Sequence, residues 1–556
     1  MTLSYDDAAA RVTAPGERFE TTRIDVRGVP VTAFVDVPTS LREVFATARA
    51  RGDDTFLVFE DERWSFAEVM RHVDAMAALL VDRYGVQKGD RVAVGMRNYP
   101  EWVIAFAAVT SVGAVSVSLN AWWTEDELDY ALEDSGSTVL VADRERAERA
   151  RAAAARLGTR VLAVRAGDAL PADVDRWEDL RPLGAPMPDV TVEPDDDATI
   201  LYTSGTTGRP KGAVSTHRAI LQALTAFGCK TAIERLRRPD LPAPAGAPVF
   251  ILIVPLFHVT GCVPVMLSCF ANGLKLVIMY KWDAERALEQ IEREGVTNFV
   301  GVPTQSWDLL ESPRFAEFDT SSLVAIGGGG APAPPELVKR VSSSFKGGGP
   351  NIGYGMTETN AYGPGNSGPD YLTHPTSTGR AAPILEIEVR DPEGVRSLPR
   401  GERGEIWFKG PHLISGYWNK PEATAETIVD GWLRTGDIGR IDEEGFVYVE
   451  DRAKDMVLRG GENVYCAEVE AALYEHPGVY EAAVFGVPHE RLGEEVACVI
   501  YPRPGHELSV AEIQAHVRER LAPFKVPTVV TIASAQLPRN AAGKIVKREL
   551  RDQLAG

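Results

Sequence analysis

The sequence predicts an α/β protein with a large N-terminal domain of helix-covered, mainly parallel sheets, a small β-rich subdomain and a C-terminal α+β domain. The chain has 556 residues, about three to four times the usual size of one domain. Strand, helix and strand patterns recur through the first 450 residues, as in βαβ units with parallel sheets. From about residue 401, short alternating segments between Gly, Asn and Pro turns replace this pattern.

Two units show the βαβ pattern clearly, because in each a helical stretch connects two strands. Their segments are 91–96, 99–112 and 114–119 in the first unit, and 275–279, 283–294 and 297–302 in the second. The most apolar run, 249–257, has nine residues including Pro255, far fewer than the roughly 20 that span a membrane. We therefore expect a buried strand there and no transmembrane segment.

The last third of the chain predicts two further units. Segments such as 404–408 and 445–449 indicate a β-rich subdomain over about 401–450. Beyond it the pattern is α+β, and Ser509 with Glu512 forms a capping box that opens a helix. The expected elements there are a helix over 467–475 and strands over 481–485 and 496–501. We expect domains over 1–450 and 455–556, joined at 451–454.

The net charge indicates which binding partners the protein can have, and the cysteine content indicates its redox compartment. The chain carries 59 basic and 79 acidic side chains, a net charge of -20, which repels nucleic acid and anionic membrane surfaces. None of the five cysteines lies in a C-x-x-C pair, so a reducing compartment is expected. Residues 1–11 lack the apolar stretch of a secretory signal. We expect a cytoplasmic protein that binds small molecules and no nucleic acid. The protein could also form a homo-oligomer.

The strongest local motif is Tyr-Thr-Ser-Gly-Thr-Thr-Gly-Arg-Pro-Lys-Gly over 202–212. Its glycines let backbone N–H groups approach phosphate oxygens, its hydroxyl groups add donors, and Lys211 adds positive charge. A Walker P-loop would need Ser or Thr after the lysine, whereas Lys211 follows Pro210 and precedes Gly212. A flexible surface linker would explain the Gly and Ser content but not the Pro-Lys-Gly end.

Six further motifs follow in order, and with this loop they resemble the adenylate-forming superfamily of acyl-CoA synthetases, firefly luciferase and peptide-synthetase adenylation domains. The resemblance covers nearly the whole chain and is closest to stand-alone acyl-CoA synthetases. The motifs are Pro-Leu-Phe-His-Val-Thr-Gly at 255–261, Gly-Gly-Gly-Gly-Ala-Pro at 327–332, Gly-Tyr-Gly-Met-Thr-Glu at 353–358, Gly-Trp-Leu-Arg-Thr-Gly-Asp at 431–437, Asp-Arg-Ala-Lys at 451–454 and Pro-Arg-Asn-Ala-Ala-Gly-Lys at 538–544.

The resemblance implies an acyl-CoA ligase that uses ATP, Mg²⁺ and coenzyme A. A carboxylic acid would first become an acyl-adenylate, and the acyl group would then pass to the CoA thiol after a mobile C-terminal domain rotates about Lys454. The glycine-rich segment 327–330 leads us to expect a medium-to-long or bulky apolar acid. Two alternatives stay open. The enzyme could transfer the acyl group to an amine, a carrier protein or oxygen in place of CoA, or it could run only one of the two half-reactions. A non-catalytic adenylate-binding protein is the remote alternative.

The same resemblance implies roles for individual residues. Lys544 would bridge the carboxylate and the α-phosphate, Glu358 would hold the magnesium ion, and His258 would orient the acid and gate the CoA tunnel. Without the resemblance, Glu358 and Lys544 would be solvated charges, and His258 and Tyr354 core residues. The catalytic set is Lys544, Glu358, Thr203 and His258. The nucleotide set is Thr203, Ser204, Gly205, Thr206, Thr207, Lys211, Gly330, Ala331, Pro332, Tyr354, Gly355, Met356, Thr357, Asp437, Arg452 and Lys544. The CoA tunnel would contain Gly460, Gly461 and His258, and the acyl pocket His258, Cys262, Val302, Trp307, Gly327, Gly328 and Gly329.

Overall fold

The computed structural model describes most of the chain. The described ranges are 3–167, 170–203, 209–239, 246–452, 455–460, 462–541 and 543–555. Six predicted site residues lie outside them: Ser204, Gly205, Thr206, Thr207, Lys454 and Gly461.

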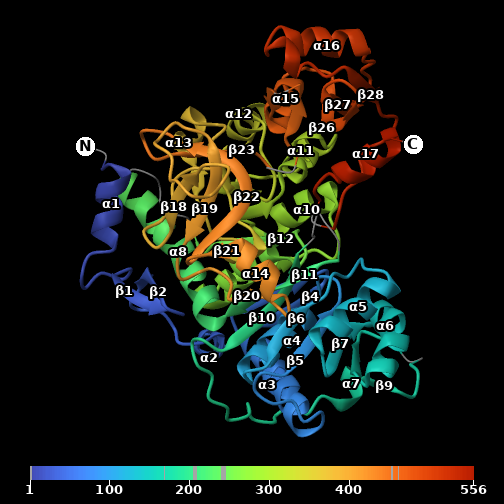
Figure 1. The fold of residues 1–556 in the computed structure, drawn as a ribbon. Helices are drawn as coiled ribbons and strands as arrows, with labels where there is room; N and C mark the ends of the chain where they lie inside the picture. The colour runs from blue at the N-terminus through green and yellow to red at the C-terminus, as the bar shows by residue number, and fades with distance from the viewer. Residues whose placement is uncertain are drawn as a thin grey trace.

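Two eight-stranded sheets form the centre of the N-terminal domain (Figure 1). Both are parallel in their interior and antiparallel only toward their edges, which confirms the predicted mainly parallel architecture. The first has the order β20 (Gly416–Tyr417), β11 (Lys211–Thr216), β10 (Asp197–Thr203), β6 (Val115–Ser118), β5 (Arg91–Gly95), β7 (Val139–Asp143), β8 (Arg160–Val164) and β9 (Val174–Arg176). The second has the order β17 (Gly365–Ser367), β16 (Gly349–Gly353), β15 (Ala325–Gly329), β14 (Asn298–Gly301), β12 (Val249–Leu252), β13 (Lys275–Ile278), β3 (Thr55–Phe59) and β4 (Glu62–Ser65).

Helices cover these sheets. Helix α4 (Pro100–Ser111) is buried at every residue because it packs on β5 and β6 and also against α3 (Phe66–Asp82), which contacts β3 and β4. Both predicted βαβ units are present, as β5–α4–β6 and as β13–α10–β14. Further helices are α1 (Tyr5–Val12), α2 (Leu41–Ala48), α5 (Glu125–Ser135), α6 (Arg144–Leu157), α7 (Trp177–Leu180), α8 (His217–Arg237), α9 (Ser268–Asn272), α10 (Ala284–Glu294), α11 (Pro303–Glu311), α12 (Pro335–Ser344), α13 (Gly368–Thr373) and α14 (Pro421–Thr427). A hairpin of β1 (Thr21–Val26) and β2 (Val29–Phe34) lies near the N-terminus.

The β-rich subdomain is a five-stranded antiparallel sheet that begins earlier than predicted. Its first strand pairs with β19 along its whole length, so the sheet starts near residue 386 and not near 401. The strands are β18 (Glu386–Arg390), β19 (Gly404–Lys409), β21 (Ile428–Val429), β22 (Trp432–Ile441) and β23 (Val447–Arg452).

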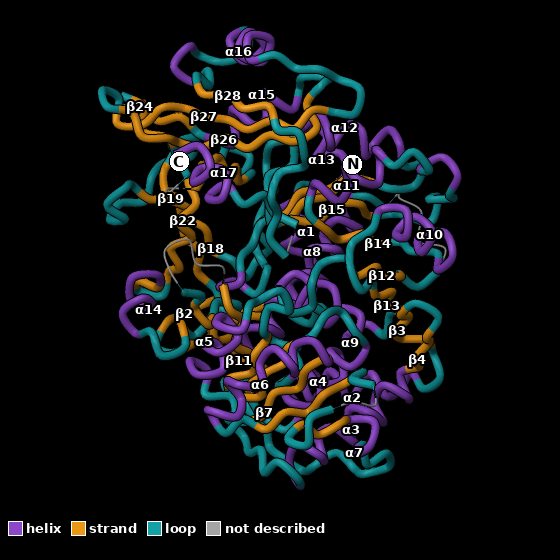
Figure 2. The backbone as a smooth tube through the Cα atoms, turned by 90° about the vertical axis from the view of Figure 1, so that its right-hand side faces the viewer, coloured by secondary structure: helices purple, strands orange, loops and turns teal. Residues whose placement is uncertain are grey.

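The C-terminal part has its own sheet and its own apolar core. The predicted capping box is confirmed, because the Ser509 hydroxyl accepts a 3.2 Å hydrogen bond from the Glu512 amide at the start of α16. This part lies over α11 and α12 at the top of Figures 1 and 2. Its elements are β24 (Val457–Arg459), β25 (Glu462–Val464), α15 (Cys466–Tyr474), β26 (Val479–His489), β27 (Gly493–Pro502), α16 (Val510–Arg518), β28 (Val529–Ile532) and α17 (Lys547–Ala555).

The apolar run 249–257 forms a shorter strand than expected. Strand β12 ends at Leu252, where its pairing with β13 and β14 also ends. Pro255 then lacks a donor for continued pairing, and its carbonyl accepts a hydrogen bond from the His258 amide in a turn. No helix among the described residues is long and apolar enough to cross a membrane.

Candidate active site

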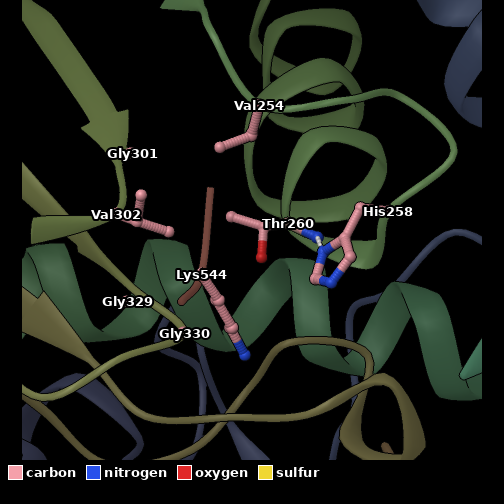
Figure 3. Close-up of a pocket in the computed structure, with 8 residues that line it drawn as sticks. All are labelled: Val254, His258, Thr260, Gly301, Val302, Gly329, Gly330 and Lys544. Carbon is pink, nitrogen blue, oxygen red and sulfur yellow. Dashed lines mark hydrogen bonds between the residues drawn. The ribbon is translucent and has the colours of Figure 1, made fainter. Parts of the chain in front are cut away.

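A small pocket lies beyond the carboxyl ends of β12, β14 and β15 (Figure 3). Ligands of open parallel sheets bind at this edge, where loops after the strands converge. Among the described residues that line it, only Lys544 comes from the C-terminal part. The pocket is lined by Val254, His258, Thr260, Gly301, Val302, Gly329, Gly330 and Lys544.

The Lys544 side chain crosses from the C-terminal domain into this pocket. Its backbone N–H donates a 3.0 Å hydrogen bond to Asn540 Oδ1, which fixes the turn that presents it. Gly330 has φ +82°, and a Cβ there would lie 3.1 Å from Lys544 Cε, so glycine permits this approach. Burial and then Arg452 lower the pKa of Lys544 to about 8, against the opposing effect of Asp437. The pocket therefore contains a poorly solvated amine that an anionic ligand would stabilise.

Asp437 contacts two other residues of the predicted nucleotide-binding set, Arg452 and Tyr354. It is 5% exposed on β22 and faces Arg452 on β23, whose Nε lies 3.3 Å from Asp437 Oδ1. The Tyr354 hydroxyl donates to Asp437 Oδ2 at 2.5 Å. Burial raises the pKa of Asp437, while Arg452, Tyr354 and Lys544 favour its charged form. Segments far apart in the sequence thus meet around one carboxylate.

Glu358 is held by Tyr417, a residue that belongs to none of the seven motifs. It is 6% exposed, and its Oε1 accepts a 2.6 Å hydrogen bond from the Tyr417 hydroxyl. No residue in the described part of the chain hydrogen-bonds Oε2 of Glu358. The Lys211 ammonium lies 4.9 Å from the centroid of the same tyrosine ring, within cation–π range. Tyr417 therefore contacts both Lys211, the predicted phosphate-binding lysine, and Glu358, the predicted metal ligand.

Thr203 and Lys211 are register partners at the ends of the antiparallel strands β10 and β11. The Thr203 hydroxyl donates a 3.4 Å hydrogen bond to the Lys211 carbonyl. The predicted phosphate loop thus connects these two strand ends, although 204–208 lie outside the described residues.

His258 contributes a neutral imidazole to the pocket. Burial, together with the charge of Lys544, lowers its pKa to about 4, so the ring is uncharged near pH 7. Its Nδ1 accepts a 3.4 Å hydrogen bond from the Thr260 amide (Figure 3). None of the described residues hydrogen-bonds the other ring nitrogen, Nε2. This geometry favours orientation of a ligand over proton transfer.

The two predicted adenine-binding segments lie side by side. Gly330, Ala331 and Pro332 follow β15, and residues 354–357 follow the adjacent parallel strand β16. Both segments therefore leave the same edge of the sheet. In the second, the Met356 amide donates to Thr359 Oγ1 at 3.0 Å. Close packing explains Gly355, because a Cβ there would lie 2.4 Å from the Ala361 carbonyl oxygen.

The predicted acyl-pocket residues have different surroundings. Val302 lines the pocket with Lys544 and His258, and so does Gly329. Cys262 is fully buried in the core, and Trp307 lies beneath two guanidinium groups at the boundary with the C-terminal domain.

Strand packing accounts for glycine at 327 and 328. A Cβ at Gly327 would lie 1.9 Å from the Asn351 carbonyl oxygen, and one at Gly328 would lie 1.8 Å from that of Gly301. Glycine at these two positions therefore allows the neighbouring strands to approach closely. The long or bulky acyl pocket stays a prediction.

Gly460 lies away from this pocket in the described orientation. It is exposed at the turn between β24 and β25, with φ +60°, and its amide donates a 2.8 Å hydrogen bond to the Leu492 carbonyl. Gly460 does not line the pocket that contains Lys544. Its place in a CoA tunnel is a prediction that requires another orientation of the domain.

Four residues at the site were not predicted individually: Tyr417, Val254, Thr260 and Gly301. Thr260 belongs to the motif around His258, so its neighbourhood could have been inferred. Tyr417 reaches Glu358 because β20 pairs with β11, a long-range pairing that no local pattern indicates.

Comparison with known proteins identifies the family of the chain. A family model described as AMP-binding enzyme matches residues 44–418, and one described as AMP-binding enzyme C-terminal domain matches 468–544. A feruloyl-CoA synthase from Amycolatopsis sp is 38% identical over 490 residues, covering 88% of this chain and 93% of that protein. The long-chain-fatty-acid–CoA ligase FadD13 from Mycobacterium tuberculosis is 35% identical over 504 residues, covering 89% and 93%.

The fold also matches a solved structure. ATP-bound MatB from Rhodopseudomonas palustris superposes with a TM-score of 0.80 and 32% identity, covering 92% of this chain and 98% of that one. The chain therefore belongs to the AMP-binding enzyme family. Within it, the chain is an AMP-forming acid–thiol ligase of the acyl-CoA synthetase class, as the resemblance in the motifs indicated.

Proposed function

We propose that this chain joins a carboxylic acid to coenzyme A in two steps at one site. In the first, the carboxylate attacks the α-phosphorus of ATP, forming acyl-AMP and releasing pyrophosphate. In the second, the CoA thiol loses its proton and attacks the acyl carbon, and AMP leaves. The observation that carries this proposal is the placement of Lys544 from one domain among the pocket residues of the other.

Electrostatic positioning dominates the first step, because two anions must meet. The Lys544 ammonium would lie between the acid carboxylate and the α-phosphate, and ligand binding would raise its lowered pKa. Asp437 would accept hydrogen bonds from the ribose hydroxyls in place of the Tyr354 hydroxyl, and the tyrosine ring would pack on adenine. Neutral His258 would orient the acid.

Glu358 is suited to a magnesium ion that ATP phosphates also hold. It offers a buried carboxylate whose Oε2 is bonded by none of the described residues, and Mg²⁺ prefers one or two carboxylates plus substrate oxygens. When bound, the ion would supply positive charge beside the phosphates. Tyr417 would orient Glu358 through its hydrogen bond to Oε1.

The second step is proposed to require rotation of the C-terminal domain about residues 451–454. In the described orientation Lys544 fills part of the pocket, while Gly460 is exposed elsewhere. Lys454→Pro should therefore lower the rate of thioester formation about tenfold or more while largely sparing adenylation, because proline restricts the backbone φ angle. Single-turnover rates of each half-reaction measure this. An unchanged ratio of the two rates would refute the hinge assignment.

The acid is proposed to be medium-to-long or bulky and apolar. The feruloyl-CoA synthase and the long-chain-fatty-acid ligase, by their names, act on acids of these kinds, and Val254 and Val302 make part of the pocket apolar. Incubation with ATP, magnesium and a panel of acids, with and without CoA, tests this by mass spectrometry. We expect acyl-CoA from an aromatic or long-chain acid. Acetate as the preferred substrate would contradict the proposed class, and acyl-AMP that persists with CoA would contradict CoA as acceptor.

A further inference from the structure

A second contact between the domains lies on α11, outside the pocket. Asp308 on this helix accepts a 2.8 Å hydrogen bond from the Tyr480 hydroxyl of the C-terminal domain, and its other oxygen accepts one of 2.8 Å from Trp282 Nε1. Both carboxylate oxygens are therefore occupied. Burial raises the pKa of Tyr480, and Asp308 raises it further, so the phenol keeps its donor proton at neutral pH.

Tyr480 reaches α11 because of an irregularity in its strand. Val479 pairs with Pro502 and Glu481 with Tyr501, which leaves Tyr480 as the extra residue of a β-bulge between β26 and β27. Bulges redirect side chains and are associated with functional contacts. Here the bulge directs the phenol at Asp308.

One turn further along α11, charged groups strengthen the contact. Arg503 of the C-terminal domain and Arg340 of α12 both donate to Glu311 Oε1. Their guanidinium groups lie 5.0 and 4.9 Å from the Trp307 ring centroid, within cation–π range. Burial raises the pKa of Glu311, but the two arginines outweigh this effect and hold it below its usual value. The Arg503 side chain is 16% exposed, so solvent screens this pair less than a surface pair.

The contact continues to the turn that presents Lys544. Glu481, next to Tyr480, is 1% exposed and accepts hydrogen bonds from the Leu537 amide and from Arg539. Arg539 in turn donates a 3.0 Å hydrogen bond to the Gly543 carbonyl. The same carbonyl accepts a 3.5 Å hydrogen bond from Thr304 Oγ1 at the start of α11. Helix α11 therefore holds both the C-terminal sheet and the turn before Lys544.

We propose that α11 is the docking helix that stabilises the orientation for adenylation, with Tyr480 and Arg503 as positioning residues for Lys544. We name these contacts the α11 latch, formed by Trp307, Asp308 and Glu311 with Tyr480 and Arg503. The proposal rests on the proposed function, because it assigns the latch to one of the two half-reactions. The latch favours the orientation in which Lys544 occupies the pocket, and thioester formation requires that it open.

The test is the double variant Tyr480→Phe with Arg503→Met, compared with Asp308→Ala on the opposite domain, which removes both acceptor oxygens. Adenylation is followed in single turnover without CoA, and thioester formation is started from supplied acyl-AMP and CoA. We expect adenylation to slow about tenfold in each variant, because hydrogen bonds that hold the C-terminal domain on α11, and so position Lys544, are lost. Thioester formation should be unchanged or faster. When Arg503→Lys replaces Arg503→Met in the double variant, part of the adenylation rate should return, because lysine keeps the positive charge beside Glu311.

A matched control separates the latch from general damage. Arg520 pairs with Glu475 inside the C-terminal domain, so Arg520→Met removes an ion pair without touching α11 and should change neither rate. Equal slowing of both half-reactions by the latch variants, or no slowing of either, would overturn the latch. Failure of the proposed function is distinguishable, because the unsubstituted protein would then form no acyl-AMP in the same assay.

Discussion

Lys544→Ala is expected to slow acyl-adenylate formation by at least about 100-fold while sparing thioester formation from supplied acyl-AMP. The alanine removes the Lys544 ammonium, which enters the pocket from the C-terminal domain, and loss of one group that stabilises developing charge costs about this much. The second half-reaction does not use this cation in the proposed orientation. Rapid-quench measurement of acyl-AMP and of acyl-CoA in separate single-turnover experiments gives both rates.

A pH profile and a conservative variant identify the charge as the cause. The pKa of Lys544 in the free enzyme is lowered to about 8, so the amine is protonated below this pH and loses its charge above it. The kcat/KM of adenylation should therefore fall as pH rises through about 8, since this parameter reports free-enzyme groups. Lys544→Arg should lack that fall because guanidinium stays protonated. Equal loss of both half-reactions in Lys544→Ala would contradict the assigned role.

Glu358→Gln is expected to lower the kcat/KM for MgATP by about 100-fold. Glutamine keeps the shape of the side chain and its hydrogen bond with Tyr417 but loses the charge that would hold the metal ion. Calorimetric titration gives a second readout: binding of ATP with magnesium should weaken, whereas binding of ATP without magnesium should change little.

Two further variants serve as comparisons for Glu358→Gln: one removes only the hydrogen bond to Glu358, and the other removes a carboxylate charge far from the site. Tyr417→Phe should give a smaller loss, of about tenfold, because Glu358 keeps its charge and loses only an orienting hydrogen bond. Glu422→Gln, on the exposed first turn of α14, makes the same charge change away from the site and should leave the kinetics unchanged. If Glu358→Gln bound MgATP normally, Glu358 would not be the metal ligand.

Local signals in the sequence predicted much of this architecture. Apolar strands alternating with helices predicted the parallel sheets, and the capping box of Ser509 and Glu512 predicted the start of α16. The structure also brings residues of three motifs together, because Tyr354 donates a hydrogen bond to Asp437 and Lys544 lies close enough to affect the pKa of that carboxyl.

Contacts set by tertiary packing could not be predicted in this way. Tyr417 and Glu358 are 59 positions apart, and Tyr480 and Asp308 are 172 apart; both pairs depend on how strands and domains dock. The glycines at 327 and 328 were interpreted as space for an acyl chain, whereas close strand packing also requires them. A glycine in a sequence does not distinguish a neighbouring ligand from a neighbouring backbone.

In the proposed mechanism this chain forms an enzyme-bound acyl-adenylate before any thiol reacts. Exchange of labelled pyrophosphate into ATP, measured with acid and magnesium but without CoA, tests it most directly. We predict acid-dependent exchange in the unsubstituted protein and its loss in Lys544→Ala. Exchange that requires CoA, or cleavage of ATP to ADP and phosphate during acid turnover, would contradict this mechanism.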